Sequence, residues 1–352
     1  MKDIIIVGRG LAAHVLAHSC HQKGLRFMLI GDPSLSQCSR VAAGIWNPIV
    51  FKRLTKSWMA DSLIPHLEKF YTHCEDTLGK KITTSRTFIR PFSEEQEKAL
   101  WLKRGANELD EFIERKIHET KPAELQGVHL PLGYSHVLKT GNLHVPEFLE
   151  ASDKFFGESV VNEVFDHGQL QILNGRVRYQ QHKAKAIVFC EGYKVKDSPF
   201  FRFIPLKPVK GEVLDVRIDD LHLKNTIINK GAFIMDTAPQ HYRVGASYNW
   251  EMLNDELSEE GRDDLISKLK QITSLPYTVL NHKAGVRPSS IDRRPVLGQH
   301  PKHPELFIFN GLGTKGVMLA PYFADKFVLF LLQKQALPAE VDVKRHYHLY
   351  NG

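Results

Sequence analysis

Hydrophobic positions follow two different periods along the chain. Near the N-terminus, the apolar run from Asp3 to Val7 leads into a glycine-rich segment, after which apolar side chains recur every three to four positions as far as Gln22. This pattern predicts a strand, a tight turn and a helix. Gly24 ends the helix, and Arg26 to Ile30 form a second apolar run. The first 32 residues therefore predict a βαβ unit.

Three histidines of this predicted helix fall outside its apolar arc. His14, His18 and His21 have the spacing i, i+4 and i+7, which could place three metal ligands on one helix face. No carboxylate or thiol nearby would complete the ligand set, and polar residues are expected opposite a packed face. We therefore expect a polar helix face, and the sequence predicts no metal site.

The middle of the chain continues with alternating helical and extended patterns. Three further amphipathic stretches predict helices, the first two as a peripheral layer, and they span Met59 to Leu78, Glu94 to Glu114, and Asn142 to Phe155. Val160 to Phe165 and Leu170 to Leu173 are expected to pair as a hairpin around the turn from Asp166 to Gln169. Ala186 to Cys190 predicts a further strand of the first sheet.

The last third of the chain predicts a second kind of sheet and then a return to the first. Pro205 to Ile218 and Ala232 to Tyr248 alternate as antiparallel strands do. Leu306 to Phe309 then predicts a buried strand, followed by a glycine-rich turn and a helix reaching about Gln335. We expect a mixed α/β protein: a Rossmann-like domain made of residues 1–50, 140–204 and 284–352, and a mainly antiparallel substrate domain made of residues 51–139 and 205–283.

Composition limits the class of protein. The 352 residues are 42% hydrophobic and 25% charged, which excludes collagen-like, disordered and coiled-coil classes and fits about two domains. The longest apolar run near the C-terminus, Phe327 to Leu332, is far shorter than the ~20 residues of a membrane-spanning helix. The four cysteines, Cys20, Cys38, Cys74 and Cys190, lack CxxC spacing. We expect reduced thiols, no membrane span and a cytoplasmic protein.

The charge of the chain suggests, but does not specify, an anionic partner. The formal net charge is +7, which is compatible with a dinucleotide, a carboxylate substrate or RNA. The basic residues occur as scattered pairs rather than as a block, so a solvated basic surface is the simpler interpretation. This scatter disfavours a nucleic-acid partner without excluding tRNA, and the sequence predicts no oligomeric state.

The first glycine turn carries the pattern of a dinucleotide site. A GxGxxA pattern at the end of a strand allows a tight turn, a close approach of pyrophosphate and binding at a helix N-terminus. An acid 24 residues after the first glycine could accept hydrogen bonds from ribose hydroxyls. The predicted contacts are Gly8, Gly10, Leu11, Ala12, Ala13 and Asp32. A strand–helix turn without a ligand remains the alternative.

Further blocks favour FAD over NAD. The small residues between Ser39 and Gly44 would let a flavin ring lie against the backbone, and here the sequence resembles the D-amino-acid oxidase and glycine oxidase family of FAD-dependent oxidoreductases. Four more segments are similar to blocks of that family: Ala186 to Gly192, Pro205 to Leu214, the GxRPxxxDxxPxxG pattern from Gly285 to Gly298, and Asn310 to Val317. Residues 52–140 match only loosely.

The resemblance implies a set of FAD contacts from several parts of the chain. Besides the first glycine turn, they are Ser39, Arg40, Ala42, Ala43, Gly44, Val161, Glu191, Gly192, Gly311, Gly313, Thr314, Lys315, Gly316 and Val317. The second helix N-terminus, with Lys315 beside it, is expected to supply positive potential where a reduced flavin becomes anionic. Lys315 is therefore a predicted catalytic residue as well.

The same resemblance implies the chemistry. Members of the family transfer hydride from a carbon bearing an amine to flavin N5, with oxygen as the expected acceptor. Arg287 matches the arginine that binds the substrate carboxylate, although a structural ion pair is the alternative role. Where the family generally presents a tyrosine hydroxyl, this chain has Phe233, and Tyr242 or Tyr248 could replace it.

Three alternatives stay open at this point. The substrate could be an amino acid, a secondary amine, or a carboxymethylaminomethyl group of tRNA, as in the related oxidase half of a bifunctional wobble-uridine modification enzyme. The protein could bind flavin without turning over a substrate. It could also be an NAD-dependent dehydrogenase, which the later blocks disfavour.

Overall fold

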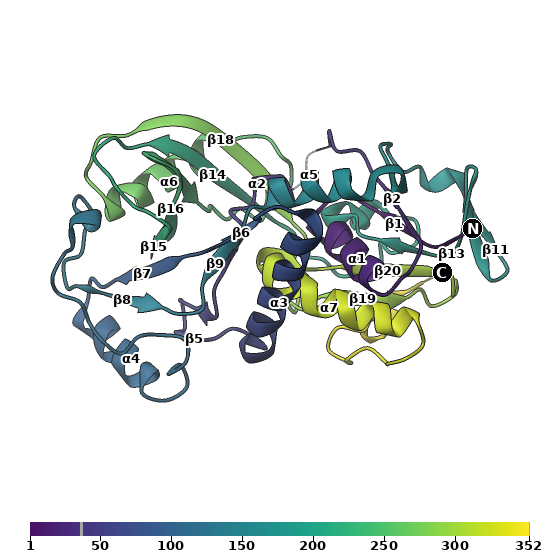
Figure 1. Cartoon of the computed structure of the whole chain (residues 1–352), viewed down its shortest axis with the longest axis horizontal. Helices are drawn as coiled ribbons and strands as arrows, with labels where there is room; N and C mark the ends of the chain where they lie inside the picture. Colours follow the sequence, from purple (N-terminus) through teal and green to yellow (C-terminus); the bar gives the residue numbers. More distant parts are fainter. Residues whose placement is uncertain (36–37, 352) are drawn as a thin grey trace.

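Two β-sheets lie side by side along the long axis of the molecule (Figure 1). The computed structural model describes residues 1–35 and 38–351. One sheet has eight strands and the other has seven. Both chain termini lie at the end of the molecule that holds the eight-stranded sheet (Figure 1). The expected architecture, a Rossmann-like sheet with helices and a second, mainly antiparallel sheet, is confirmed.

The eight-stranded sheet has a parallel centre and an antiparallel margin. Its parallel strands are β1 (Lys2–Val7), β2 (Phe27–Ile30), β10 (Val160–Val161), β13 (His182–Phe189) and β20 (Leu306–Asn310). The antiparallel strands are β11 (Leu170–Leu173), β12 (Arg176–Tyr179) and β19 (Val296–Gln299). Apolar side chains cover both faces of the central strands, which is why these segments read as continuous hydrophobic runs.

The expected hairpin between residues 160–165 and 170–173 is wrong. Only Val160 and Val161 form a strand there, and this strand joins β2 in parallel. A short turn follows, in which the Asp166 carboxylate accepts a hydrogen bond from the Gly168 amide at 2.9 Å. The strand β11 pairs instead with β12. The strands β10 and β11 lie at opposite ends of the strand order β10-β2-β1-β13-β12-β11, so they cannot form a hairpin.

Three helices pack on one face of this sheet, α1 (Leu11–Gln22), α5 (Val145–Phe156) and α7 (Gly316–Leu331), and α3 (Ala60–Leu78) packs against α5 and α7. The expectation that the histidines of α1 form a solvated polar face is wrong, because two of the three are buried. His14 and His18 are buried beneath α5, where their Nε2 atoms lie 2.8 Å from Asp153 and from Ser152. His21 alone is exposed. The helix is thus covered on two sides.

The seven-stranded sheet is mainly antiparallel. Its strands run in the order β18 (Thr278–Arg287), β14 (Val209–Arg217), β17 (His241–Gly245), β16 (Ala232–Ala238), β15 (Thr226–Lys230), β7 (Thr87–Pro91) and β8 (Tyr134–Val137). Among these neighbours β15 and β7 are parallel and the other pairs are antiparallel. Helix α6 (Glu259–Ile272) buries Leu265 and Leu269 against one face.

The helix expected from Glu94 to Glu114 is shorter than predicted. Helix α4 spans Glu95–Gly105, and the chain then turns toward β8. Leu109, Phe112 and Ile113 are buried in the core beside that strand. Packing of this apolar cluster against the sheet therefore overrides the helical periodicity of the segment.

Small elements join the two sheets. They are α2 (Cys38–Val41) and the short strands β3 (Ile45–Trp46), β4 (Ile49–Val50), β5 (Thr55–Lys56), β6 (Thr83–Ser85) and β9 (Gly141–Leu143). Helix α3 packs against α7, and the hydroxyl of Tyr71 donates to the carbonyl of Val317 at 3.0 Å. The domain boundaries stay a prediction.

Two simpler expectations concern cysteines and membranes. All four cysteines lie in the described residues and are free. None of the helices in the described ranges combines the length and the apolar character required to cross a bilayer.

Burial of His18 makes stability depend on pH. Burial lowers the pKa of His18 from 6.5 to about 3, so below pH 6.5 the unfolded chain binds a proton that the folded chain does not. Stability from this residue is complete above pH 6.5 and falls as the pH falls toward 3. When the pH is lowered from 7.5 to 5.0, we expect the wild type to lose roughly 1–2 kcal/mol more of its unfolding free energy than His18→Leu does.

Urea unfolding of the wild type and of His18→Leu at both pH values measures this difference. His21→Leu is the matched control, because His21 lies on the same helix and is exposed. Equal pH dependence in all three proteins would show that the pKa of His18 is not lowered in the folded state.

Candidate functional site

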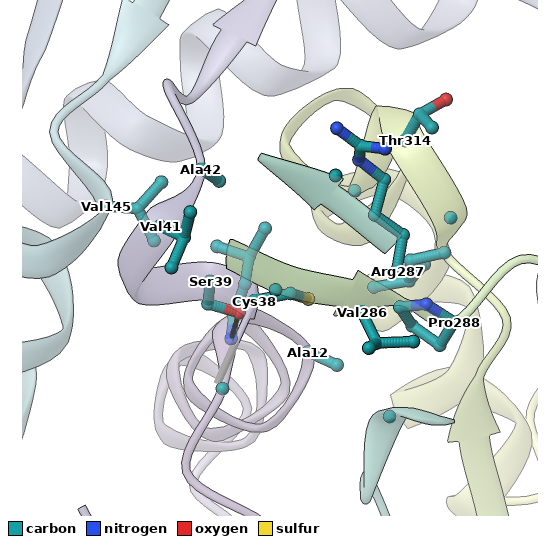
Figure 2. Close-up of a pocket in the computed structure, with 18 of the residues that line it drawn as sticks. Ala12, Cys38, Ser39, Val41, Ala42, Val145, Val286, Arg287, Pro288 and Thr314 are labelled. Carbon is teal, nitrogen blue, oxygen red and sulfur yellow. Dashed lines mark hydrogen bonds between the residues drawn. The ribbon is translucent and has the colours of Figure 1, made fainter. Parts of the chain in front are cut away.

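A cavity of about 660 Å³ lies where the two sheets meet. Its walls come from the N-termini of α1 and α7, from α2, and from the strands β14, β16 and β18. Figure 2 shows Val41 and Ala42 on one side of this pocket and Arg287 and Thr314 on the other. The volume falls in the range of about 300–1,000 Å³ that is common for ligand sites.

The first glycine turn lines one end of the cavity. Gly8, Gly10, Leu11 and Ala12 all contribute to its wall. Gly8 has a φ of +121°, and a Cβ atom at this position would lie 2.5 Å from the carbonyl oxygen of Cys190. A side chain therefore cannot be accommodated there, and the backbone itself forms the cavity surface.

Ser39 joins α2 to the start of α1. Its hydroxyl oxygen accepts a hydrogen bond from the Leu11 amide at 3.0 Å. One of the free amide groups of the α1 N-terminus is thereby satisfied by α2. The small residues Ala42, Ala43 and Gly44 continue the wall beyond Ser39.

Two carboxylates line the same end. Asp32 follows β2, and its carboxylate accepts hydrogen bonds from the amide of Ser34 at 2.7 Å and from its hydroxyl at 2.6 Å. These hydrogen bonds lower the pKa of Asp32, so the group is ionised at neutral pH. Glu191 follows β13 and contacts His167 at 3.1 Å through Oε1, while its Oε2 is buried without a partner among the described residues.

The second helix N-terminus lines the cavity next to the first, since a Cβ atom on Gly316 would lie 3.4 Å from Cδ2 of Leu11. Gly313, Thr314, Lys315, Gly316 and Val317 all line the cavity. The Lys315 ammonium donates to the carbonyl of Asn47 at 3.4 Å and to the hydroxyl of Ser57. Burial lowers the pKa of Lys315 from 10.5 to about 8. Lys315 is thus mainly charged at pH 7, close to the pH at which it loses its proton.

Four of the predicted cofactor contacts do not line the cavity. Ala13 is fully buried in α1, and Val161 accepts a hydrogen bond from the Gly31 amide within the sheet. Gly311 packs against Val296. The Arg40 guanidinium lies 3.6 Å from the carboxylate of Glu150, at a surface depression outside the cavity. Their contacts with a cofactor stay predictions.

Arg287 lies at the end of β18 and points into the cavity (Figure 2). Its guanidinium makes two long contacts, at 3.5 Å with the carbonyl of Lys210 and at 3.4 Å with that of Ser247. No acidic side chain in residues 1–35 and 38–351 lies within ion-pair distance of it, so the ion-pair alternative is not supported. Burial lowers the pKa of Arg287, but an arginine remains charged at any physiological pH.

Glycine makes room for that side chain. In the register of β14 and β18, Gly211 lies opposite Gly285, and a Cβ atom on Gly211 would lie 1.9 Å from Nη2 of Arg287. The guanidinium therefore rests directly on the backbone of β14. The sequence predicts Gly211 only as part of a strand. That it makes room for the Arg287 guanidinium becomes visible only once the two strands are paired.

The aromatic residues around Arg287 have separate functions. Tyr242 is buried, and its hydroxyl donates to the Leu221 carbonyl, so it belongs to the sheet core and does not replace the missing tyrosine. Tyr248 lines the cavity, and its ring lies 4.8 Å from the Arg287 guanidinium carbon. Phe233 also lines the cavity. Tyr248 is thus the tyrosine placed to contact a ligand beside Arg287.

Comparison with known proteins points to one family. A sequence model described as FAD dependent oxidoreductase matches residues 3–328. The tRNA 5-methylaminomethyl-2-thiouridine biosynthesis bifunctional protein of Acinetobacter baylyi is 26% identical over 222 residues, covering 61% of this chain and 35% of that protein. The protein of the same description from Legionella pneumophila is 20% identical over 385 residues, covering 95% and 54%. The chain thus spans about a third to a half of these relatives.

Shorter and structural similarities agree. Glycine oxidase of Bacillus subtilis is 31% identical over 147 residues, covering 39% of this chain and 38% of that protein. The crystal structure of glycine oxidase from Bacillus cereus has a TM-score of 0.76 at 19% identity and covers 96% of both chains. L-α-Glycerophosphate oxidase of Mycoplasma pneumoniae, solved with FAD bound, has a TM-score of 0.71 at 13% identity and covers 94% of both. At these identities the structural matches establish the fold.

The cavity walls suit FAD. Two helix N-termini and a glycine turn that excludes side chains are suited to pyrophosphate. Two buried polar atoms of lining residues, Oε2 of Glu191 and Nε1 of Trp46, have no partner among the described residues and could bond a ligand. The sequence does not identify Trp46 as a wall residue, because only the folded chain brings it into the same cavity lining as the first glycine turn.

The close approach at Gly211 predicts a specific defect. In Gly211→Ala the added methyl group displaces the Arg287 guanidinium, so we expect acetate to bind the FAD-loaded protein at least about tenfold more weakly. Titration of acetate, followed by the change in flavin absorbance, measures this affinity. Gly168→Ala, at an exposed turn outside the cavity, is the control. Equal acetate affinity in Gly211→Ala and the wild type would contradict the placement of Arg287.

Proposed function

Because the chain belongs to the DAO family of FAD-dependent oxidoreductases, we propose that it oxidises the C–N bond of an amino acid or carboxylate-bearing secondary amine. FAD is its cofactor. The family depends on FAD, which sets aside the NAD-dependent dehydrogenase, and it consists of oxidoreductases, which disfavours a flavoprotein without turnover. The observation that carries the choice of substrate is the unpaired guanidinium of Arg287 in the cavity.

The substrate carboxylate would be bound by Arg287. A guanidinium forms two parallel hydrogen bonds with a carboxylate, and here both the glycine floor and the Tyr248 ring restrict its movement. The two weak carbonyl contacts of Arg287 leave donors available for a ligand. Binding the carboxylate at this point fixes the direction of the rest of the substrate in the cavity.

The remaining walls would exclude water and orient the carbon that loses hydride. The apolar residues Phe51, Phe88, Phe233 and Val213 line the same cavity as the guanidinium. When bound, FAD would supply the oxidant that takes up a hydride, which carries both electrons of the C–H bond, while the nitrogen lone pair of the substrate forms the C=N bond of an imine. The chain contributes mainly orientation and charge, since this step needs little acid–base assistance.

Lys315 and the α7 N-terminus would add positive potential to the part of the cavity wall that they form. The ammonium is held between the Asn47 carbonyl and the Ser57 hydroxyl, so its position is defined before any ligand binds. Such a preorganised charge stabilises negative charge that develops nearby during the reaction. We propose oxygen as the final electron acceptor, in keeping with the oxidases among the similar proteins.

Loss of Arg287 tests the proposed substrate contact. In Arg287→Ala we expect the KM for an amino-acid substrate to rise by roughly 30-fold to 1,000-fold, equivalent to about 2–4 kcal/mol, with FAD still bound. Steady-state peroxide production across a panel of amino acids and N-methyl amino acids, together with the flavin spectrum, measures both quantities. Arg293→Ala is the control because Arg293 is exposed and does not line the cavity. An unchanged KM would refute the assignment.

A second candidate substrate is a modified tRNA. The observation that favours it is a stacked aromatic pair at the cavity: the rings of Tyr248 and Trp250 lie 5.9 Å apart at 23°, and the residues are 53% and 56% exposed. Exposed aromatic rings are common platforms for unstacked nucleobases. The relatives from Acinetobacter and Legionella are named for tRNA 5-methylaminomethyl-2-thiouridine biosynthesis.

The exposed ring separates the two candidates. If tRNA is the substrate, we expect Trp250→Ala to weaken turnover of tRNA bearing a carboxymethylaminomethyl group by roughly tenfold, since one base–aromatic stack contributes about 1–3 kcal/mol. Turnover of a free amino acid should change little. Leu280→Ala, an exposed apolar residue outside the cavity, is the control. Equal effects of Trp250→Ala on both substrates, or no tRNA turnover in the wild type, would exclude the tRNA candidate.

A further inference from the structure

Outside the cavity, one carboxylate and two imidazoles meet beside the antiparallel sheet. Glu114 and His118 lie in the segment that follows α4, and His136 lies in β8. Their ligand atoms all lie within 4.8 Å of one another. None of the three residues lines the cavity. Neither the proposed oxidation nor the sequence pattern assigns them a function.

The three side chains converge on a single oxygen atom. Oε2 of Glu114 lies 2.8 Å from Nε2 of His118 and 2.7 Å from Nδ1 of His136. The two imidazole rings lie 4.9 Å apart, centre to centre, at an angle of 58°. Two nitrogen donors and one carboxylate are a ligand set that zinc commonly takes, with a fourth position left for water.

The backbone of Glu114 is fixed by three hydrogen bonds. Its carbonyl oxygen accepts from the indole Nε1 of Trp101 at 2.8 Å and from the hydroxyl of Ser135 at 2.9 Å. Its amide donates to the carbonyl of His136 at 2.9 Å. The carboxylate is therefore carried by a backbone that is already held against β8, which reduces the ordering cost of ligand binding.

His118 is held in a similar way from the other side. Its amide and carbonyl pair with the carbonyl and amide of Tyr134 at 2.8 and 3.0 Å. Its ring stacks on that of Tyr134, with centres 5.0 Å apart and planes 17° from parallel. The ring orientation is thus set by packing, as it is for metal-binding histidines whose surroundings fix the imidazole.

Charge and access also suit a cation. Among the described residues, no lysine or arginine lies within ion-pair distance of Glu114. The side chains are 32%, 22% and 25% exposed, which leaves an entry path and space for a water ligand.

We propose that Glu114, His118 and His136 form a binding site for a divalent transition metal ion, with Zn²⁺ the best match to this donor set. Bonds of about 2.1 Å in a tetrahedral site separate ligand atoms by roughly 3.4 Å, so the side chains need to move by less than ~1 Å. The metal would replace the two imidazole protons that now face the carboxylate, and would fasten the segment after α4 to β8.

Metal titration of the full FAD-loaded chain tests this directly. After removal of metals with EDTA, we expect ZnCl₂ to bind at about one ion per chain by calorimetry and to raise the thermal midpoint. Glu114→Gln and His136→Ala should each weaken this binding by roughly tenfold or more. Addition of CoCl₂ should give the visible absorption of a four-coordinate cobalt site in the wild type only.

Controls keep the outcomes distinct. His129→Ala removes a half-buried histidine of the same region, whose Nε2 lies 2.7 Å from the Ser274 hydroxyl, and this variant should bind zinc as the wild type does. The flavin spectrum confirms that each variant is folded, and Glu114→Gln, with nearly the same shape, carries the test if His136→Ala does not fold. No zinc binding by the wild type, or binding that survives Glu114→Gln unchanged, would overturn the proposal.

Discussion

The site depends on a positive charge that the protein itself leaves unneutralised. Burying a guanidinium away from water has a large free-energy cost unless a partner compensates it. In the described part of the chain, Arg287 has two carbonyl contacts and the face of Tyr248 but no acidic partner. A ligand carboxylate would complete this arrangement. The charge is accommodated because Gly211 lets the guanidinium lie on bare backbone.

The position of the cavity walls that would hold FAD follows from the parallel sheet. The strands β2, β1, β13 and β20 are neighbours and run the same way, so the segments after them meet at one edge. That edge holds the first glycine turn, Asp32, Glu191 and the start of α7. Ligands of such sheets bind at the carboxyl ends of the strands for this reason. The antiparallel sheet then closes the other side with the β14 and β18 surface that carries Arg287.

Much of this was predictable from the sequence, where local pattern and tertiary structure agree. The β1–α1–β2 unit, the last glycine turn and the family resemblance depend on short, contiguous segments. Errors arose where distant packing decides. His14 and His18 are buried because α5 covers a second side of α1, and residues 106–114 leave the helical path because their apolar side chains join the sheet core. Neither effect has a signal within the segment itself.

Pairings between strands were the other source of hidden information. Gly211 and Gly285 are far apart in sequence and gain their shared meaning only from the register that sets them opposite each other. The cluster of Glu114, His118 and His136 is of the same kind, since the third residue is 22 positions from the first and comes from another element. Single-sequence periodicity cannot supply such contacts.

The most direct test compares each amino acid of a substrate panel with its own carboxamide under anaerobic conditions. The rate at which substrate bleaches the bound flavin reports the oxidation step without any contribution from oxygen. If the unpaired Arg287 selects a carboxylate, the acid bleaches the flavin and the neutral amide does so at least roughly 100-fold more slowly at the same concentration. Equal rates for acid and amide would contradict the account.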